Sequence, residues 1–143
     1  MSINKTGSAI WQGGLKDGKG QVSTQSGVLK DIPYNFAQRF EGTAGSNPEE
    51  LIGAAHASCY SMALSMVLGE AGLTPERIGT QATVSLEQDA GGFSITKVHL
   101  ETRASIPGAD EAAFQDAANK AKEGCPVSKL FNAEITLDAK LEA

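Results

Sequence analysis

The chain has 143 residues, of which 41% are hydrophobic and 20% charged, and its formal net charge is −5 at pH 7. This length fits one globular domain, and the acidic balance argues against partners that present phosphate backbones or anionic lipid. We therefore expect a single domain over residues 1–143 that binds neither nucleic acid nor a membrane surface.

The first third of the chain is predicted to be mainly extended. Residues 7–30 alternate around the turn-prone stretch "LKDGKG", which predicts a β-hairpin. In the following "DIPYNFAQRFEG", the aromatic residues Tyr34, Phe36 and Phe40 indicate extended structure, and Pro33 biases the residue before it away from helix. Arg39 lies inside this aromatic segment.

A long central helix is predicted to begin at Pro48. Asn47 is a suitable N-cap, and Glu50 stands where a capping box places its acidic residue. Glycines at 69 and 72 mark its end. Apolar or small residues lie on nearly all sides of this helix, so we expect other parts of the protein to cover it. They include the stripe Ile52, Ala55, Cys59, Met62 and Met66.

The polar residues of this helix make it a poor membrane span. The N-terminus lacks the apolar core of a secretory signal and the Arg-rich pattern of a transit peptide. We therefore expect a cytoplasmic protein.

The second half alternates between strands and helices. Residues 79–106 predict a long hairpin that turns at 90–92, and Asp110 caps a helix that ends at Gly124. A short helix is predicted to start at Pro126, and strict alternation over residues 132–142 predicts a half-buried strand. The whole pattern predicts an α+β fold.

The two cysteines occur in different local settings. Cys125 stands at the N-cap of the short helix, where unpaired amides, the helix dipole and the nearby Lys122 and Lys129 favour a thiolate. Cys59 has no cation nearer in sequence than His56, and a buried thiol without a cation has a raised pKa. A nucleophilic Cys59 would need an arginine from elsewhere in the fold, and Arg39 is our candidate.

Other interpretations of these residues stay open. A permanent disulfide is unusual in a reducing cytosol, whereas two inert buried thiols are common. A zinc site could use Cys59, Cys125, His56 and His99, although the chain has no C-x-x-C or H-x-x-x-H pair. Cys–His acyl chemistry would need a group that orients the base, and neither histidine shows one.

Two stretches carry a family resemblance. "NPEELIGAAHASCYSMALS" and the distant "GCPVSK" resemble the paired signature of the OsmC/Ohr family of thiol peroxidases. The N-terminal "W-x-G…G-x-G-x-V-S-T-x-S-G-V-L" and "P-Y-x-F-x-x-R-F-E-G" patterns are similar to the OsmC branch, so the resemblance runs from about Gly7 to the last predicted strand. It implies antiparallel sheets wrapped around central helices in an intertwined homodimer.

The resemblance also implies a catalytic set. Cys59 would be the peroxidatic cysteine and Cys125 the resolving one, with Arg39 and Glu49 as an Arg–Glu pair. The Ohr branch supplies its arginine from near the N-terminus, but this chain has no arginine before position 39. The implied reaction reduces organic hydroperoxides, and hydrogen peroxide less well, without a metal or cofactor. An external dithiol, of the lipoyl type in this family, would then reduce the Cys59–Cys125 disulfide.

The spacing along the central helix bears on assembly. Glu49 and Cys59 are ten positions apart, or about 15 Å along a helix, which is too far for one arginine side chain to bridge. Glu49 would then come from a second chain, with two antiparallel helices crossing near Ala54. The alternative is a small-ligand-binding or stress-related structural protein of the same fold whose cysteines are idle.

Overall fold

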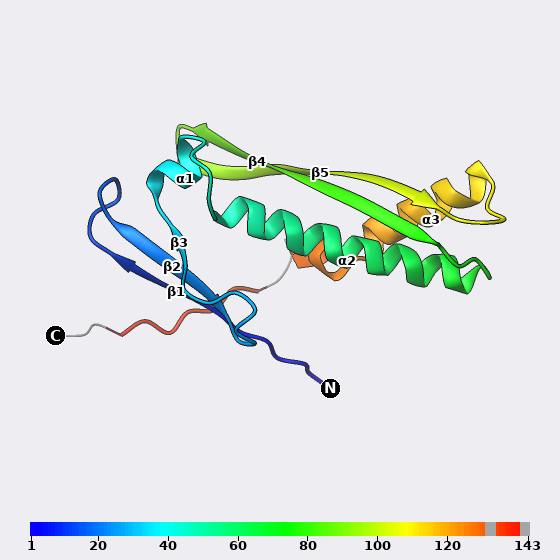
Figure 1. Cartoon of the computed structure of the whole chain (residues 1–143), viewed down its shortest axis with the longest axis horizontal. Helices are drawn as coiled ribbons and strands as arrows, with labels where there is room; N and C mark the ends of the chain where they lie inside the picture. The colour runs from blue at the N-terminus through cyan, green and yellow to red at the C-terminus, as the bar shows by residue number, and fades with distance from the viewer. Residues whose placement is uncertain (131–133, 141–143) are drawn as a thin grey trace. The chain divides into compact units, whose positions relative to one another are not determined.

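The computed structural model describes residues 1–130 and 134–140. The chain divides into two compact units, each of which contains segments from distant parts of the sequence (Figure 1). Unit 1 comprises Met1–Ile52 and Val84–Lys97, and unit 2 comprises Gly53–Thr83 and Val98–Ala143. The fold class is α+β, as the sequence predicts.

Unit 1 contains an antiparallel sheet with the strand order β1-β2-β3. Its strands are β1 (Gly7–Gln12), β2 (Lys19–Thr24) and β3 (Ile32–Tyr34), so the predicted N-terminal hairpin is confirmed. Gly20 on β2 lies opposite Trp11 on one side and Tyr34 on the other. The two aromatic rings approach with centroids 5.5 Å apart, and a Cβ at Gly20 would lie 2.5 Å from the Tyr34 ring. The register therefore requires glycine here.

The prediction of extended structure is wrong for Phe36–Phe40, which form the short helix α1. Asn35 caps this helix, because its side-chain oxygen accepts a hydrogen bond from the Gln38 backbone N–H at 2.9 Å. A capping asparagine thus outweighs the strand preference of the aromatic residues. Arg39 is consequently placed in the last turn of a helix.

The central helix α2 spans Pro48–Glu70, and its predicted start and end are confirmed. Residues at a helical spacing, Gly53, His56, Tyr60, Leu64 and Leu68, are buried on one face. The expectation that protein covers the whole helix is wrong for the single chain. Met62 is 77% exposed and Met66 62% exposed, because elements of this chain pack against only part of the circumference.

Within residues 1–130 and 134–140, α2 is the one helix that is long and apolar enough to cross a membrane, with a mean hydropathy of 1.5. The core helix of a globular protein meets the same criterion. Tyr60, Leu64 and Leu68 belong to the core of unit 2, so α2 is a core helix in this fold.

The long hairpin is formed by β4 (Arg77–Asp89) and β5 (Gly92–Ser105), which confirms the predicted turn around residue 90. The Asp89 side chain accepts a hydrogen bond from the Gly91 N–H at 2.9 Å. Gly92 follows with a φ of +117°, a backbone conformation that favours glycine. These two features close the turn.

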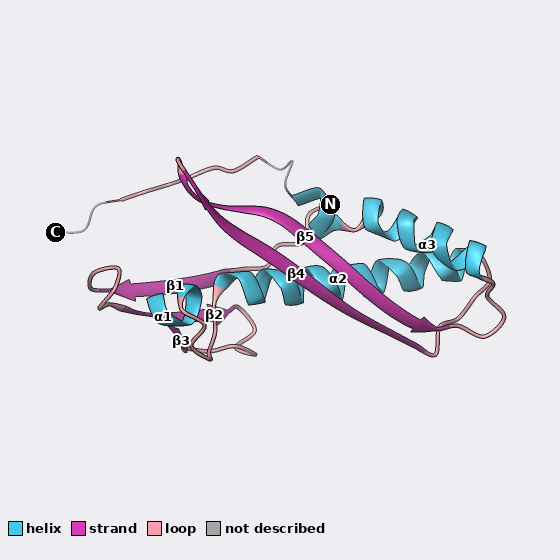
Figure 2. Cartoon of the chain, turned by 90° about the horizontal axis from the view of Figure 1, so that it is seen from above, coloured by secondary structure: helices cyan, strands magenta, loops and turns pink. Residues whose placement is uncertain are grey.

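Unit 2 packs two further helices against α2 (Figure 2). Helix α3 (Glu111–Gly124) is capped by Asp110, whose side chain accepts from the Ala113 N–H at 2.8 Å. Helix α4 (Pro126–Lys129) follows at once. The buried core combines one face of α2 with small residues of α3 and the α3–α4 junction: Tyr60, Leu64, Leu68, Ala117, Ala121 and Cys125. Both predicted helices are confirmed.

The predicted C-terminal strand is wrong over residues 134–140, which have no regular structure. Ile135 is 94% exposed and Leu137 is 88% exposed. The remaining positions of the predicted strand, 132, 133, 141 and 142, lie outside the described residues. An alternating segment forms a strand only when another strand supplies hydrogen bonds, and residues 134–140 pair with none of the strands in the described part of the chain.

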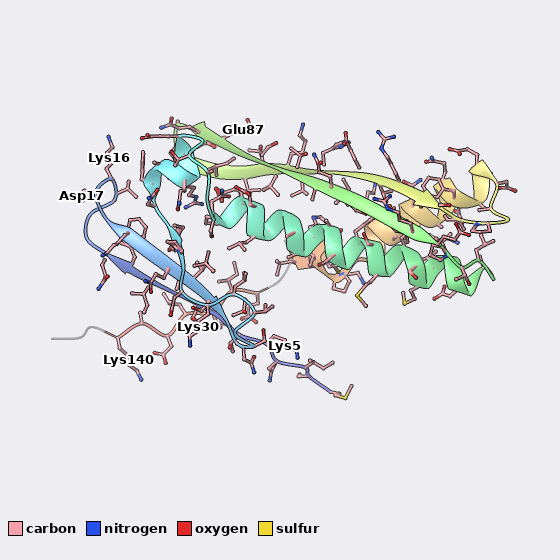
Figure 3. All side chains as sticks on the ribbon, in the orientation of Figure 1. Lys5, Lys16, Asp17, Lys30, Glu87 and Lys140 are labelled. Carbon is pink, nitrogen blue, oxygen red and sulfur yellow. The ribbon has the colours of Figure 1, made fainter. Side chains whose placement is uncertain are left out.

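Charged side chains lie mainly on the outside of both units. Lys5, Lys30 and Glu87 are exposed and extend away from the ribbon (Figure 3). Among the described residues of unit 2, the buried side chains are correspondingly apolar except for the ring of His56.

Candidate active site

Cys59 and Cys125 meet in unit 2. Cys59 lies midway along α2, and Cys125 lies where α3 ends and α4 begins. The backbone at Cys125 is held on both sides, because its N–H donates to the Ala121 carbonyl at 2.9 Å and its carbonyl accepts from the Lys129 N–H at 3.2 Å. The two Sγ atoms lie 3.0 Å apart in hydrogen-bond contact, and both thiols are free. The fold therefore joins two cysteines that are 66 positions apart.

The two sulfurs differ in their preference for the proton. Burial raises the pKa of Cys59, and the contact with Cys125 raises it further. Burial also raises the pKa of Cys125, but hydrogen bonds from Cys59, Ser128 and Val127 outweigh this effect and hold that pKa below its ordinary value. Either thiol can donate in the sulfur–sulfur contact. The extra donors around Cys125 make its thiol easier to ionise than that of Cys59, as the local sequence predicts.

A buried histidine stands one turn before Cys59. His56 is 4% exposed, and its Nε2 lies 2.9 Å from the Ser128 hydroxyl oxygen. Burial lowers the pKa of His56, so its ring is neutral near pH 7. The other ring nitrogen, Nδ1, is buried and has no hydrogen-bond partner among the described residues. His56 and Ser128 thus lie at the side of the cysteine pair.

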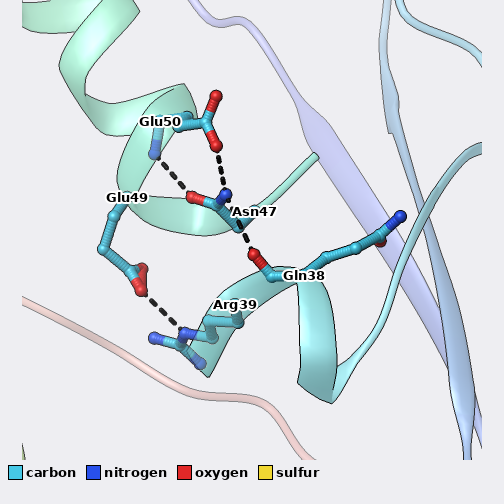
Figure 4. Close-up of polar contacts among 5 residues, drawn as sticks. All are labelled: Gln38, Arg39, Asn47, Glu49 and Glu50. Atoms are coloured by element: carbon cyan, nitrogen blue, oxygen red, sulfur yellow. Dashed lines mark hydrogen bonds and ion pairs between the residues drawn. The ribbon is translucent and has the colours of Figure 1, made fainter. Parts of the chain in front are cut away.

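Arg39 and Glu49 form an ion pair in unit 1. The Arg39 Nε donates to Glu49 Oε1 at 2.8 Å, with side chains 35% and 12% exposed (Figure 4). Glu49 lies in the first turn of α2, where the helix dipole favours a carboxylate. The hydrogen bond uses Nε, so other N–H groups of the guanidinium have no side-chain acceptor within the described part of the chain. These N–H groups can bind an anion or a polar ligand.

A capping network holds the Arg39 helix against the start of α2. Asn47 accepts from the Glu50 backbone N–H at 2.9 Å, and its amide group donates to the Glu50 carboxylate and to the Gln38 carbonyl (Figure 4). Asn47 is confirmed as the predicted capping residue. Its hydrogen bond to the Gln38 carbonyl is not predicted by the sequence pattern. Asn47 therefore joins the helix that carries Arg39 to the helix that carries Glu49.

Arg39 lies over the ring of Phe40, which belongs to an aromatic cluster. Its guanidinium carbon lies 5.2 Å from the centre of the Phe40 ring, within cation–π range. The Phe40 ring contacts Phe36 on one side and Phe93 on the other, with centroid distances of 4.9 Å in both cases. We call Phe36, Phe40 and Phe93 the phenylalanine cluster. It provides an apolar surface beside a cation.

The other candidates from the sequence are not brought into either group. His99 is exposed on β5, with Nε2 3.8 Å from Glu101 Oε1. Arg77 and Arg103 line an open hollow of about 310 Å³ on the β4–β5 hairpin, whose lining includes neither cysteine. Across residues 1–130 and 134–140, no three His, Cys, Asp or Glu side chains are grouped so as to hold a metal ion.

Sequence reasoning missed the contact between His56 and Ser128. The two residues are 72 positions apart, and Ser128 is part of the "GCPVSK" stretch without being singled out there. The position of Ser128, three residues after an N-cap, is the signal that could have drawn attention to it. A side chain at this position often turns back toward the cap.

Comparison with known proteins places the chain in a family. Residues 40–140 match the family described as OsmC-like protein. The chain is 57% identical over 143 residues to peroxiredoxin OsmC of Escherichia coli (strain K12), with all of both chains covered. It is 31% identical to OhrB of Bacillus subtilis, an organic hydroperoxide resistance protein, whose crystal structure superposes with a TM-score of 0.63 and covers 87% of this chain and 88% of that one.

A more distant structure shows the fold alone. An OsmC-like protein from Mycoplasma pneumoniae has a TM-score of 0.71 at 14% identity, covering 92% of this chain and 89% of that one. The chain belongs to the OsmC family.

Proposed function

We propose that this protein is a thiol peroxidase that reduces organic hydroperoxides to alcohols, and hydrogen peroxide less well. The observation that carries the proposal is the 3.0 Å contact between the Cys59 and Cys125 sulfurs. A disulfide needs the sulfurs about 2.05 Å apart, so the two side chains have to approach by about 1 Å. Full-length identity of 57% to a relative named peroxiredoxin supports the same activity.

The chemistry has three balanced steps. The Cys59 thiolate attacks the terminal oxygen of R–O–O–H, the O–O bond breaks, and the alkoxide leaves and is protonated to the alcohol. Cys59 is now a sulfenic acid. The Cys125 sulfur attacks the Cys59 sulfur, hydroxide leaves and is protonated to water, and a disulfide forms. An external dithiol, of the lipoyl type by family resemblance, reduces this disulfide and is itself oxidised.

Arg39 supplies the cation that the described residues of unit 2 do not provide to Cys59. A guanidinium beside the sulfur favours the thiolate and stabilises the charge that develops on the peroxide oxygens. The unpaired oxygen of Glu49, Oε2, is buried without a partner among the described residues and can accept the hydroperoxide O–H. The phenylalanine cluster beside Arg39 favours substrates that carry an apolar group.

A second copy of the chain completes the site. Arg39 pairs with the Glu49 of its own chain, and Glu49 is about 15 Å along α2 from Cys59. The pair as a whole therefore acts on the Cys59 of a partner chain, in a homodimer in which each chain forms one OsmC-like domain. Exposed Met62 and Met66 on α2, and Ile135 and Leu137 near the C-terminus, provide apolar surface for this contact. We place the dimer in the cytoplasm, with no metal or cofactor in the reaction.

One experiment separates this activity from a protein with idle cysteines. Reduced protein is mixed with a small excess of tert-butyl hydroperoxide, quenched with acid and analysed by peptide mass. We expect a loss of two hydrogens localised to a peptide pair that contains Cys59 and Cys125. Cys59→Ser should neither form the pair nor consume hydroperoxide, and Cys125→Ser should stop at a sulfenic acid that dimedone traps. Turnover by Cys59→Ser would contradict the proposal.

A further inference from the structure

The resolving cysteine has hydrogen-bonding neighbours that the catalytic set does not use. Cys125 is completely buried, and its neighbour Ser128 stands three positions later, on the first turn of α4. At this spacing the side chain of the later residue lies beside the capping residue. Ser128 in turn contacts His56 of α2 at 2.9 Å. The Ser128 side chain thus contacts the His56 ring from the first turn of the helix that Cys125 begins, inside an otherwise apolar core.

The burial of His56 fixes the direction of its hydrogen bond with Ser128. A proton on Nδ1 would be a buried donor without an acceptor among the described residues, which costs more free energy than an unused acceptor nitrogen. The proton is therefore assigned to Nε2, which donates to the Ser128 oxygen. The Ser128 hydroxyl hydrogen is then free to donate to the Cys125 sulfur.

We propose that His56 and Ser128 are positioning residues that form a hydrogen-bond relay to Cys125 and stabilise it as the thiolate that attacks the Cys59 sulfenic acid. The inference rests on the proposed function, because it concerns the second step of that reaction. The step itself is unchanged: a Cys59–Cys125 bond forms, the S–O bond breaks, and hydroxide leaves to become water. The lowered pKa of Cys125, caused in part by the Ser128 hydroxyl, agrees with this role.

Few other groups near this sulfur can titrate. Cys59 and Tyr60 face it from α2, and the Tyr60 hydroxyl donates to the Ala118 carbonyl at 3.1 Å. The strands that pack on the same core contribute the apolar side chains Ile78 and Leu100. Lys122 and Lys129, which precede and follow Cys125 on α3 and α4, are exposed to solvent. The relay thus supplies hydrogen bonds where solvent cannot.

The expected size of the effect follows from two opposing changes. Loss of one hydrogen bond to an ionised group raises a pKa by about one unit, which lowers the thiolate fraction about tenfold below that pKa. The more basic thiolate is about threefold more nucleophilic, so the net rate falls roughly threefold. At a pH where Cys125 is fully ionised in both proteins, only the difference in nucleophilicity remains. The variant should then condense as fast as the wild type or faster.

The test measures disulfide formation in a single turnover. Reduced protein is mixed with increasing tert-butyl hydroperoxide in a quenched-flow instrument, and the limiting rate, which no longer rises with hydroperoxide, reports the condensation step. Ser128→Ala should lower this rate roughly threefold near neutral pH, and its pH profile should cross the wild-type profile at high pH. Ser128→Thr, which keeps the hydroxyl, should stay near the wild type. The first step, measured as sulfenic acid trapped in the Cys125→Ser background, should be unaffected by Ser128→Ala.

A second pair of variants tests the far end of the relay. His56→Gln keeps an amide N–H that can reach Ser128 and should condense at nearly the wild-type rate. His56→Leu removes the donor and should show the same crossing pH profile with a smaller change. An unchanged rate in both Ser128→Ala and His56→Leu would overturn the relay, as would slowing by one constant factor at every pH. If the wild type itself forms no Cys59–Cys125 disulfide, the proposed function fails and not the relay alone.

Discussion

In a single chain, the surroundings of the two sulfurs favour a proton on Cys59, which is the sulfur that attacks the peroxide in the proposed reaction. Burial raises the pKa of Cys59, whereas hydrogen bonds lower that of Cys125. Only a thiolate attacks a peroxide at a useful rate. A positive charge beside Cys59 would reverse this preference, and the Arg39 guanidinium has N–H groups that its hydrogen bond to Glu49 leaves free.

Replacement of Arg39 should therefore slow the first step. We expect Arg39→Ala to raise the pKa of Cys59 and to lower the rate of hydroperoxide consumption roughly a hundredfold, the size typical for loss of one group that stabilises developing charge. Arg39→Lys should recover only part of the rate, because an ammonium lacks the planar set of donors. Thiolate absorbance against pH and stopped-flow peroxide assays measure both quantities. Arg77→Ala and Arg103→Ala serve as controls, and equal slowing in them would refute a specific role for Arg39.

Burial of His56 makes a separate prediction about stability. The pKa of His56 is lowered from its usual 6.5, so below that pH the unfolded chain binds a proton that the folded chain does not. The stability linked to this group is complete above pH 6.5 and is lost as the pH falls toward the folded-state pKa.

The urea midpoint of the wild type should thus fall more steeply than that of His56→Gln between about pH 6.5 and pH 5. Trp11 fluorescence can report the unfolding transition. His99→Gln, which changes an exposed histidine on β5, should keep the wild-type slope. Identical slopes in all three proteins would mean that His56 is as easily protonated in the folded protein as in the unfolded chain.

At the level of elements, the sequence predicted those helices and strands whose ends carry local signals. The caps Asn47 and Asp110 and the turn near Gly91 mark α2, α3 and the β4–β5 hairpin correctly. Helix α1 is not predicted, because the aromatic composition favours a strand whereas the cap at Asn35 starts a helix. The strand over residues 132–142 was predicted from alternation, which shows that a face can be buried but not what buries it.

The candidate site is likewise predictable from the sequence only in part. Cys59, Cys125, Arg39 and Glu49 could be named from the family signature, and the thiolate preference of Cys125 from its place before Pro126. The link from His56 to Ser128 could not, since it depends on how α4 packs against α2. Contacts of this kind arise from tertiary structure and leave no periodic trace in the chain.

The cap of α2 should affect both stability and activity. Asn47→Ala removes the capping oxygen and the amide donor to Gln38, and we expect a loss of about 1 kcal/mol in the free energy of unfolding together with slower peroxide reduction. Asn47→Ser keeps a capping oxygen but cannot reach Gln38, so stability should largely return while the rate stays low. Urea titration and peroxide assays measure the two effects. Wild-type activity in Asn47→Ser would show that the Gln38 contact does not help to place Arg39.

At the scale of the whole molecule, one chain leaves its apolar surface and its chemistry incomplete. Met62 and Met66 are exposed on α2, whose opposite face belongs to the core of unit 2, and no cation among the described residues of unit 2 acts on the pKa of Cys59. If two copies of α2 pack together, the exposed methionines become covered. If each chain contributes its Arg39–Glu49 pair to the other, each Cys59 gains a cation. A dimer of this kind has two equivalent sites, each of which uses residues from both chains.

Mixed dimers should reveal this division of residues. Glu49→Ala protein and Cys59→Ser protein are each expected to be weak or inactive. Subunit exchange creates a mixed dimer. In it, the intact Cys59 of the Glu49→Ala chain meets the intact Arg39 and Glu49 of the Cys59→Ser chain. Such a dimer has one complete site, so it should show about half of the wild-type activity per dimer. The converse control mixes wild type with the Cys59→Ser/Glu49→Ala double variant. In that mixed dimer neither site is complete. The mixture should therefore be less active than the same amount of wild-type protein without the double variant. If instead the first mixture stays inactive and the converse dimer keeps half of its activity, the Arg39–Glu49 pair acts on the cysteine of its own chain.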